Sequence, residues 1–372
     1  MKVLMLSIDA TISDRNSQSY KRIKQQAGLV DGLVVFVLKK GKEYRIYDGN
    51  LSVWSSPLPG RVFSTIWAYN KARDIVKEKG IEVITAQDPF FVGTLARKLA
   101  KKFNIGYEIQ VHGDFFSNPY WRKESLLNKL VFNMGLKNVK KANSVRVVSG
   151  RVKNDLIERG INENKIIKVP IFVDWRKIKN SEASFVLKEK YPQFKFIALS
   201  LGRLEDVKHI DLLVRVWKDV VVKNPEAGLI IVGEGRQKNE LEQWVKQQGL
   251  EKNIIIEPLT KDPVSYFKGA DCFVLTSWYE GWGRTIIESL AANCPVIMTD
   301  VGCAGEVVKH DENGLVIPVN DKSALGRALD LIAHDNDLRQ RLISNTEKYL
   351  IELPDLDETM RLYVISWEKA KK

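Results

Sequence analysis

Short runs of apolar, often β-branched residues alternate with longer stretches of helical spacing along the whole chain. In the first half, the apolar runs cover residues 3–8, 33–38, 82–85, 107–111, 144–148 and 165–169. The stretches of helical spacing between them cover residues 17–27, 63–79, 90–103, 124–142 and 151–159. Strands that alternate with helices are typical of a parallel sheet with helices on both faces. Residues 43–53, with the turn sequence Asp48-Gly49-Asn50, are interpreted as an inserted hairpin.

This rhythm pauses near residues 171–194 and then restarts, which divides the chain into two parts of similar size. The apolar runs of the second part cover residues 195–200, 228–232, 253–257, 272–275, 295–299 and 315–317. We therefore predict an α/β protein of two doubly wound, Rossmann-like parallel-sheet domains that face each other across a cleft. The predicted domains are 1–172 and 173–354, and the helical stretch 355–372 is expected to pack back on the first domain.

The composition is typical of a globular protein, but the charge is unevenly distributed. Of the 372 residues, 44% are hydrophobic and 28% are charged, which argues against disorder. Residues 1–180 contain 33 Lys and Arg against 16 Asp and Glu, a net charge of +17, whereas residues 181–372 contain 25 against 30, a net charge of −5. A basic half attracts polyanions such as nucleic acid, an anionic membrane or phosphate-bearing ligands, and the alternative is a solvated basic surface without a partner.

Neither a membrane span nor a disulfide framework is predicted. The longest apolar runs, such as 33–38, are far shorter than the roughly 20 residues that cross a bilayer. The N-terminal apolar run is too short for a signal peptide. The three cysteines, Cys272, Cys294 and Cys303, are odd in number and lack the C-x-x-C spacing. We therefore expect a reduced, cytoplasmic protein.

The densest candidate for chemistry is the segment 277–288, which follows an apolar run and opens a helix. Gly281 and Gly283 let backbone N–H groups approach a ligand, and a helix N-terminus stabilises a phosphate. Glu280 lies in the turn and Glu288 lies about one turn into the helix, so each carboxylate can accept the hydrogen bonds of a sugar or ribose diol. The alternative is a glycine-rich turn followed by a solvated glutamate.

A second candidate loop follows the run 195–200. Arg203 and Lys208 flank this loop, which is predicted at the carboxyl end of a strand. Arginine offers a planar fork to a diphosphate and lysine a point charge, so the pair suits a diphosphate leaving group without a metal. Two unrelated surface cations are the alternative.

Two more strand ends carry candidate residues. The sequence Gly233-Glu234-Gly235 forms another glycine turn on the same edge, but it matches neither a dinucleotide fingerprint nor a Walker A loop. His112 ends the run 107–111 and is followed by glycine, although a lone histidine is more often structural. No metalloprotease motif, serine nucleophile elbow or His/Cys cluster is present, and Asp335 and Asp355 are interpreted as helix caps.

Together these segments resemble the family-4 glycosyltransferases of the GT-B fold, and the resemblance covers most of the chain. The matching segments are 86–90 with Gly93, His112-Gly113, Val169-Pro170 with Val173-Asp174, Gly202-Arg203, Lys208, 233–235, 280–283 with Glu288, and 294–302. The resemblance implies retaining transfer of a sugar, which we expect to be a hexose, from a UDP- or GDP-linked donor to a glycan or lipid-linked acceptor in cell-envelope polysaccharide or glycolipid synthesis. It makes 1–172 the acceptor-side domain and 173–354 the donor-binding domain.

The same resemblance implies roles for individual residues. Arg203 and Lys208 would hold the diphosphate, Glu288 the ribose and Glu280 a sugar hydroxyl, while His112 would approach the sugar from the other domain. The catalytic candidates are therefore His112, Glu280, Arg203 and Lys208. The donor-binding candidates are Gly202, Arg203, Lys208, Gly233, Glu234, Leu259, Glu280, Gly281, Trp282, Gly283, Arg284, Thr285 and Glu288. The resemblance implies no metal and no cofactor. It also implies a front-face mechanism, in which the leaving phosphate helps to deprotonate the acceptor hydroxyl.

Some positions depart from the family's pattern. The loop 9–17 replaces a frequent Gly-Gly loop after the first strand, which puts the contacts of that loop in doubt. Trp282 stands where phenylalanine is common, and His209 stands where glycine or asparagine is frequent. Ile171-Phe172 replaces a frequent Asn-Gly.

Residues 119–141 combine aromatic, apolar and basic side chains. Leu126, Leu130, Phe132 and Leu136 are expected near one helical face with lysines around it, as in helices that lie in a membrane interface. The hypothesis is that the basic first domain docks on an anionic membrane, which would make the protein peripheral on the inner face. The alternative is that this helix uses its apolar face for the core.

Two other classes of function remain open from the sequence. One is a basic module that binds an anionic surface or nucleic acid and carries a degenerate GT-B site. The retained Arg203, Lys208, Glu280 and Glu288 count against this alternative, and no nucleic-acid partner is expected. The other is a related GT-B enzyme, such as a nucleotide-sugar epimerase or hydrolase, in which this order of residues is not expected.

Overall fold

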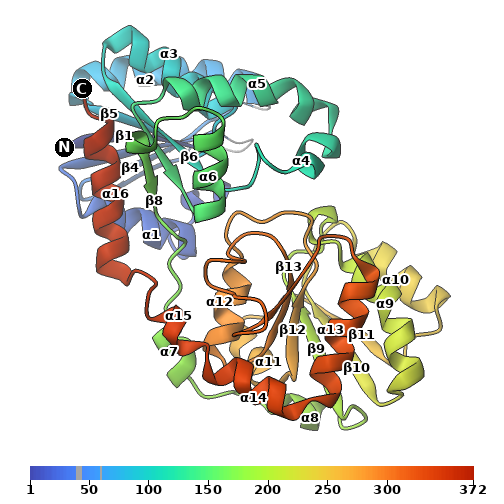
Figure 1. The fold of residues 1–372 in the computed structure, drawn as a ribbon. Helices are drawn as coiled ribbons and strands as arrows, with labels where there is room; N and C mark the ends of the chain where they lie inside the picture. The colour runs from blue at the N-terminus through green and yellow to red at the C-terminus, as the bar shows by residue number, and fades with distance from the viewer. Residues whose placement is uncertain (39–43, 59–60) are drawn as a thin grey trace. The chain divides into compact units, whose positions relative to one another are not determined.

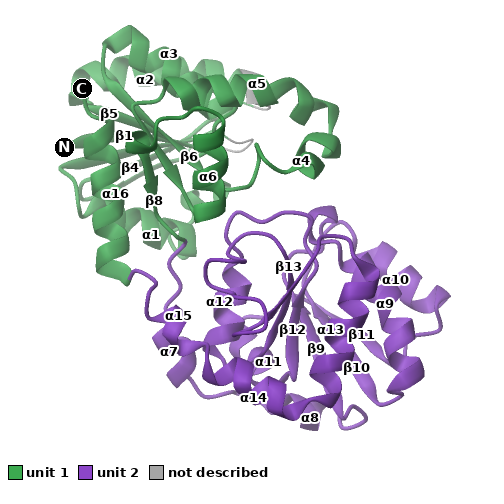
Figure 2. Ribbon diagram, viewed as in Figure 1, with its two compact units in different colours: residues 1–170, 355–372 green, residues 171–354 purple. Residues whose placement is uncertain are grey.

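The chain forms two compact units, which Figure 2 shows in different colours. The computed structural model describes residues 1–38, 44–58 and 61–372, without the side chains of residues 61 and 62. Unit 1 comprises Met1–Pro170 and Asp355–Lys372, and unit 2 comprises Ile171–Pro354. The boundary predicted from the sequence falls two residues later, after residue 172. Each unit is a twisted, mainly parallel sheet with helices on both faces (Figure 1), so the predicted doubly wound architecture is confirmed.

The sheet of unit 1 has the strand order β3-β4-β2-β1-β5-β6-β7-β8. Its strands are β1 (Lys2–Ser7), β2 (Gly32–Val37), β3 (Arg45–Asp48), β4 (Leu51–Ser55), β5 (Val83–Ala86), β6 (Gly106–Val111), β7 (Ser144–Val147) and β8 (Ile166–Lys168). The β3–β4 pair is antiparallel, as predicted for the hairpin, and β4 then pairs in parallel with β2. The hairpin thus extends the main sheet. Residue 43, the first of the predicted hairpin, lies outside the described residues.

The helices of unit 1 come from both ends of the chain. They are η1 (Ala10–Ser13), α1 (Gln18–Ala27), α2 (Arg61–Lys79), α3 (Phe91–Phe103), α4 (Pro119–Glu124), α5 (Leu126–Lys141), α6 (Gly150–Glu158), η2 (Glu163–Lys165) and α16 (Leu356–Ala370). Asp355 caps α16, as predicted, by accepting from the Glu358 N–H at 2.8 Å. The C-terminal helix α16 packs on β6 and β7, where a Cβ at Gly106 would lie 1.6 Å from the carbonyl oxygen of Ala370. Glycine at this position therefore lets α16 approach the sheet closely.

The sheet of unit 2 has the strand order β11-β10-β9-β12-β13-β14, and every pairing in it is parallel. Its strands are β9 (Phe196–Leu201), β10 (Ala227–Val232), β11 (Ile254–Glu257), β12 (Cys272–Leu275), β13 (Val296–Thr299) and β14 (Leu315–Ile317). Its helices are α7 (Trp175–Asn180), α8 (Leu187–Lys190), η3 (Asp206–Lys208), α9 (Ile210–Lys223), α10 (Lys238–Gln247), α11 (Pro263–Gly269), α12 (Arg284–Ala291), α13 (Lys322–His334), α14 (Asn336–Ser344) and α15 (Glu347–Leu350). Asp335 caps α14, as predicted.

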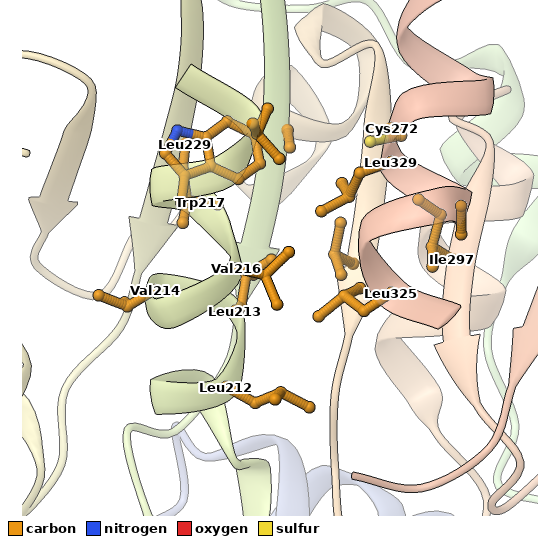
Figure 3. Packing of buried hydrophobic residues seen from close by; sticks show 14 of the residues in the cluster. Leu212, Leu213, Val214, Val216, Trp217, Leu229, Cys272, Ile297, Leu325 and Leu329 are labelled. Carbon is orange, nitrogen blue, oxygen red and sulfur yellow. The ribbon is translucent and has the colours of Figure 1, made fainter. Parts of the chain in front are cut away.

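One core layer of unit 2 lies between the sheet and the helices α9 and α13 (Figure 3). In α9, Leu213 and Trp217 follow the helical spacing of four and are completely buried, together with Leu325 and Leu329 of α13. In Figure 3, Trp217 of α9 lies beside Leu229 of β10, whereas Leu325 and Leu329 of α13 lie toward Cys272 of β12 and Ile297 of β13. Burial of this kind stabilises a fold strongly, since replacing a buried tryptophan with alanine typically costs about 3–5 kcal/mol. The sheet edge that carries the candidate site is therefore held by a rigid layer.

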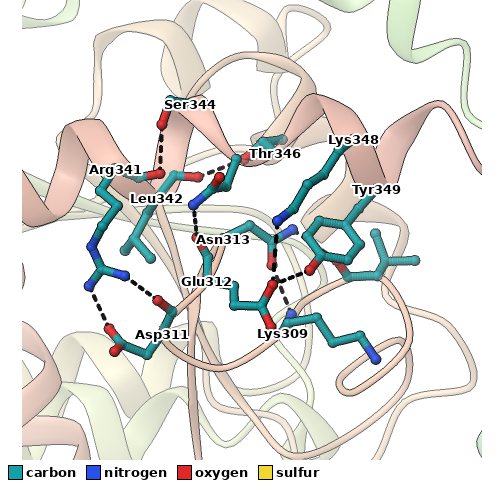
Figure 4. Close-up of polar contacts among 12 residues, drawn as sticks. Lys309, Asp311, Glu312, Asn313, Arg341, Leu342, Ser344, Thr346, Lys348 and Tyr349 are labelled. Carbon is teal, nitrogen blue, oxygen red and sulfur yellow. Dashed lines mark hydrogen bonds and ion pairs between the residues drawn. The ribbon is translucent and has the colours of Figure 1, made fainter.

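A polar network holds the segment after β13 against the last helices of unit 2 (Figure 4). Arg341 of α14 pairs with Asp311 at 2.8 Å, and Tyr349 of α15 donates a hydrogen bond to Glu312. Asn313 is completely buried and donates to the carbonyl of Val307 at 2.9 Å. Because buried amides are costly when unpaired, these contacts fix the path of residues 305–313.

The region 119–141 corrects one prediction. The helix predicted over residues 124–142 is observed as α5, and the separate short helix α4 precedes it. Ser125 is extended and ends α4, and its side chain caps α5 by accepting from the Asn128 N–H at 3.0 Å. Phe132 is buried, whereas Leu126 and Leu130 are 77% and 78% exposed. A helix turns about 100° per residue, so position 132 lies on a different side of the helix from positions 126 and 130. The expectation that these residues share one face was therefore wrong.

Candidate active site

The predicted donor-binding residues of unit 2 gather at the carboxyl edge of its sheet. Gly202 and Arg203 follow β9, Gly233 and Glu234 follow β10, and residues 276–283 follow β12. Because these strands are parallel neighbours, their carboxyl ends lie at one edge. The structure thus brings together three of the segments singled out in the sequence. A fourth, Leu259, follows β11 on the same edge and has an exposed side chain.

Two glycines allow the loops at this edge to pack against each other. A Cβ at Gly233 would lie 1.9 Å from the carbonyl oxygen of Gly202, and one at Gly235 would lie 2.1 Å from that of Leu204. Both distances are far too short for a side chain, so only glycine fits. The close approach is completed by a hydrogen bond from the Leu204 N–H to the carbonyl of Glu234 at 2.9 Å.

Lys208 and Glu280 form an ion pair at the centre of this edge. The Lys208 Nζ lies 2.5 Å from Glu280 Oε1, which also accepts a hydrogen bond from the Ser277 hydroxyl at 2.8 Å. The side chains of Lys208 and Glu280 are only 20% and 15% exposed. A partly buried, hydrogen-bonded pair of this kind keeps the ammonium group in a fixed place.

Backbone contacts tie the Lys208 loop to the loop that carries Glu280. The Thr276 hydroxyl donates to the carbonyl of Lys208 at 3.0 Å, and the Trp278 N–H donates to the carbonyl of Val207 at 2.9 Å. Thr276 and Ser277 are therefore positioning residues: Thr276 was missed in the sequence, and Ser277 lay in the candidate segment 277–288 without a role assigned to it. Their signal was their place directly after a buried strand, which is weak because any serine or threonine can occupy such a position.

Arg203 is an exposed cation of this edge. Within the described residues, no hydrogen bond or ion pair holds its guanidinium group, whereas the nearby Arg236 pairs with Glu205 at 2.7 Å. Glu234 is also exposed and pairs with Lys238 at 2.9 Å. Of the two cations predicted to hold the diphosphate, Lys208 is therefore fixed by an ion pair and Arg203 is open to a ligand.

The N-terminus of α12 supplies the second part of the predicted donor site. Gly283, at φ 94°, occupies its N-cap position in the left-handed region that favours glycine. Arg284 and Thr285 form the first positions of the helix, whose free N–H groups suit an anion. Gly281 and Gly283 are buried, and the Trp282 side chain is only 1% exposed. Trp282 is thus a core residue, and only its backbone is available to contact a ligand.

Glu288 lies one turn into α12 and is mostly buried. Burial raises the pKa of its carboxyl, and the charge of Arg284 and their hydrogen bond oppose this shift. The Arg284 Nε lies 2.8 Å from Glu288 Oε1, and the glutamate side chain is 12% exposed. A desolvated carboxylate with a single cationic partner has lone pairs left for the diol of a ribose.

His209, noted as a departure from the family's pattern, closes the back of the Lys208 loop. Its backbone lies in the left-handed region at φ 50°, where glycine or asparagine is least strained. The buried ring stacks on Trp278 at 3.9 Å and contacts Asp211 at 2.8 Å and Asn320 at 3.0 Å. These contacts offset the cost of the backbone conformation. They also hold His209, and with it the end of the loop that carries Lys208, in place.

His112 lies at the carboxyl end of β6 in unit 1, and a chain of hydrogen bonds leads to it through the sheet. Thr85 donates to the buried Glu108 at 2.7 Å, Gln110 donates to Thr85 at 2.7 Å, and the His112 Nε2 lies 2.9 Å from Gln110 Oε1. Ser366 of α16 donates to the other oxygen of Glu108. Because the Gln110 amide is used as a donor, its oxygen accepts, so His112 carries its proton on Nε2 and leaves Nδ1 as an acceptor.

Desolvation, together with the positive charges of Arg146 and Arg22, lowers the pKa of His112. The side chain is also reached by solvent, which limits the desolvation. The direction of the shift is sufficient to keep the imidazole neutral at pH 7, since its ordinary pKa is 6.5. His112 is therefore a neutral hydrogen-bonding group.

In unit 1, Asp9 holds together the loop 9–17, which stands where the family often has a Gly-Gly segment. This carboxylate caps η1 and accepts from the Thr11 N–H at 2.9 Å and from the Ser19 hydroxyl at 2.8 Å. Burial acts to raise the pKa of Asp9, but these hydrogen bonds outweigh it and the pKa is lowered. Asp9 is thus an ionised, structural residue.

Within the described parts of the chain, no group of three or more His, Cys, Asp and Glu residues is arranged to hold a metal ion. Over the same residues, no helix is both long and apolar enough to cross a bilayer.

Two family descriptions match the chain, one in each half. "Glycosyl transferases group 1" matches residues 185–349, and "Glycosyltransferase Family 4" matches residues 33–176. The crystal structure of Anabaena HepE in complex with UDP-glucose superposes with a TM-score of 0.77 over 98% of this chain and 99% of that one, at 17% identity. The architecture is therefore that of GT-B glycosyltransferases. With both halves matched, the chain belongs to the family-4 glycosyltransferases, as its motifs predicted.

Curated relatives align over shorter stretches. An uncharacterised glycosyltransferase of Methanocaldococcus jannaschii is 32% identical over 182 residues, which are 48% of this chain and 45% of that protein. An N-acetylgalactosaminyltransferase of Campylobacter jejuni, whose name gives a diphospho-undecaprenol substrate, is 33% identical over 39% of each chain. The chain therefore spans less than half the length of these two relatives.

Proposed function

We propose that this chain is a retaining glycosyltransferase that transfers a hexose from a UDP- or GDP-linked donor to a lipid-linked or glycan acceptor without a metal ion. The observation that carries the proposal is the grouping of Lys208, Glu280 and Arg203 at one sheet edge, beside the N-terminus of α12. Fixed cations at a strand edge stabilise the negative charge that develops on a leaving diphosphate. This is the chemistry that a nucleotide-sugar donor requires.

In the proposed reaction, the bond between the sugar C1 and the diphosphate oxygen breaks, and its electron pair leaves with the nucleotide. The acceptor oxygen forms a bond to C1 on the same face, and its proton goes to the departing phosphate. Lys208 and Arg203 hold the diphosphate. Glu280 uses Oε1 for Lys208 and Ser277, which assigns Oε2 to a hydroxyl of the sugar. Neutral His112 contributes its Nδ1 as an acceptor for a sugar hydroxyl.

Relatives and neighbours support the donor and acceptor classes. HepE is described in complex with UDP-glucose, which favours a UDP-linked hexose for this chain. The Campylobacter enzyme is named for a diphospho-undecaprenol substrate, which favours a lipid-linked acceptor and a role in cell-envelope glycan synthesis.

Binding of nucleoside diphosphates tests the proposal directly. We expect UDP or GDP to raise the melting temperature of the protein. We also expect the sugar-linked form of the same nucleotide to bind when a chelator has removed metal ions. Arg203→Ala should weaken nucleotide-diphosphate binding at least tenfold, since a charge-assisted hydrogen bond contributes about 1.5–3 kcal/mol. The matched control is Arg236→Ala, which removes a neighbouring arginine that is paired with Glu205. Unchanged binding in the Arg203 variant, or complete loss of binding in chelator, contradicts the proposal.

The two glutamates allow a finer test. Glu288→Gln should mainly weaken binding of the nucleoside diphosphate, because its proposed partner is the ribose. Glu280→Gln should mainly slow transfer, because its proposed partner is the sugar. Equal loss of nucleoside diphosphate affinity in the two variants contradicts this division.

A further inference from the structure

A cavity of about 230 Å³ opens at the carboxyl edge of the unit 1 sheet, and none of the roles proposed above uses it. Apolar side chains line most of it, among them Ile8, Leu38, Phe90, Trp121, Leu127 and Val131. They come from the segments after β1 and β2, from the start of α3 and from α4 and α5. The cavity is larger than the roughly 150 Å³ that accommodates benzene in a protein core. It therefore has room for part of a hydrocarbon chain.

Two of the polar residues that line this cavity already make hydrogen bonds within the protein. Asp88 accepts a hydrogen bond from the Phe90 N–H at 2.7 Å, and the Asn128 amide donates to the carbonyl of Trp121 at 2.8 Å. The rings of Phe90 and Trp121 stack on each other at 4.8 Å, so these two faces cover each other. Because most of the lining is apolar, a sugar placed here would leave most of its hydroxyl groups without partners, whereas a hydrocarbon chain needs none. The lining thus selects an apolar ligand.

The rim of the cavity exposes leucines. Leu127 lines the cavity and is 43% exposed, and Leu126 and Leu130 beside it on α5 are 77% and 78% exposed. The helices α4 and α5 that carry this rim lie at one end of unit 1, where α4 projects from the sheet (Figure 1). Exposed leucines gathered around an apolar opening are typical of a surface that meets another apolar phase.

Cations surround these leucines. Arg122, Lys123 and Lys129 are exposed, and residues 119–141 contain six Lys and Arg against one Glu. Each such cation near an anionic bilayer contributes about 1 kcal/mol to binding. The combination of exposed leucines and a net positive charge complements an anionic lipid surface.

We propose that this cavity binds the hydrocarbon chain of a lipid-linked acceptor with an anionic head group, and that Leu126 and Leu130 enter the anionic membrane from which this lipid is taken. The inference rests on the proposed glycosyltransferase function and names the acceptor class. The membrane contact proposed here is a smaller patch at the junction of α4 and α5, whereas the sequence predicted one apolar face along the whole helix.

The chain-binding site is tested with hexyl, octyl and decyl phosphate, with inorganic phosphate as the reference, by calorimetry on the full-length chain. Each methylene that enters the cavity should raise the affinity about fourfold. Val131→Phe, which narrows the cavity, and Leu127→Asp, which places a charge at its mouth, should each remove this dependence on chain length. Val222→Phe is the matched control, because Val222 lies on unit 2 and is 78% exposed. Affinity that is independent of chain length, or unchanged in both cavity variants while they remain folded, overturns the proposal.

The membrane contact is tested by sedimentation with vesicles of phosphatidylcholine alone or mixed with phosphatidylglycerol. We expect the chain to sediment with the mixed vesicles at low salt, and the double variant Leu126→Glu, Leu130→Glu to lose at least tenfold in vesicle affinity. Val222→Glu, which introduces the same charge at an equally exposed position, should leave sedimentation unchanged. Equal sedimentation with neutral and anionic vesicles, or none with either, overturns the membrane contact.

UDP binding, measured in the same preparations, separates this inference from the proposed function. If UDP binds and the alkyl phosphates show no dependence on chain length, the lipid site is wrong and the glycosyltransferase proposal stands. If the dependence on chain length is found and no nucleoside diphosphate binds, the lipid site stands as a binding site and the proposed reaction is wrong.

Discussion

The carboxyl edges of the two sheets present opposite kinds of groups, and the net charges of the units run against this difference. By sequence, unit 1 has 34 Lys and Arg against 19 Asp and Glu, a charge of +15, and unit 2 has 24 against 27, a charge of −3. Yet the edge of unit 2 carries the cations Lys208, Arg203 and Arg284, whereas that of unit 1 carries a neutral histidine and an apolar cavity. Total charge therefore does not locate a phosphate site. What matters is whether cations are fixed at a strand end, where they act at short range.

Among the variants that test this difference between the two sheet edges, Lys208→Ala is expected to have the largest effect on transfer. The substitution removes a fixed cation from the proposed diphosphate site and leaves Glu280, only 15% exposed, without its ionic partner. We expect transfer to fall by about 10²–10³-fold, the range found when a preorganised electrostatic donor is removed. Lys188→Ala is the matched control, because Lys188 pairs with Asp271 at 3.0 Å, just before β12 on the opposite edge of the same sheet. If Lys208→Ala and Lys188→Ala slow transfer to a similar extent, Lys208 contributes to folding and not to the proposed diphosphate site.

A smaller effect is expected in unit 1 from Gln110→Leu. The substitution removes the acceptor that holds the proton of His112 on Nε2. We expect transfer to slow about tenfold, the worth of one hydrogen bond, with UDP affinity unchanged because the proposed nucleotide site lies in unit 2. The nitrogen chemical shifts of the His112 ring should report a mixture of tautomers.

The control for Gln110 is Gln26→Leu, which makes the same change at another buried glutamine of unit 1. It should alter neither transfer nor the His112 signals. Unchanged tautomer and rate in the Gln110 variant would show that the hydrogen-bond chain through Thr85 and Glu108 serves the fold alone.

The smallest effect is expected from pH. Because burial raises the pKa of Glu288 above its ordinary 4.5, the carboxylate begins to take up a proton at a higher pH than a free glutamate. A protonated carboxyl accepts fewer hydrogen bonds from a ribose, so nucleotide affinity should fall a few-fold as the pH drops through this raised pKa. Titrations of UDP binding between neutral and mildly acidic pH measure the effect. Glu288→Gln should abolish the pH dependence, and Arg284→Gln, which removes the opposing charge, should shift it to higher pH.

The sequence determined the architecture of this protein and much of its candidate site. The alternation of apolar runs with helical spacing predicted the strands of both sheets, because burial on two faces requires continuous apolar residues. Residues directly after those runs, such as Arg203 and Gly233, had to reach one edge because parallel strands share their direction. The family's motifs fell on these positions in order.

Only the tertiary structure decided how the side chains are partnered. It paired Lys208 with Glu280 across 72 positions of the chain and linked His112 to Glu108 through a side chain of a neighbouring strand. It also placed Phe132 in the core and left Leu126 and Leu130 exposed. Periodicity fixes which residues lie on the same face of an element. Which face is buried, and which charges meet, depends on long-range packing that no local pattern contains.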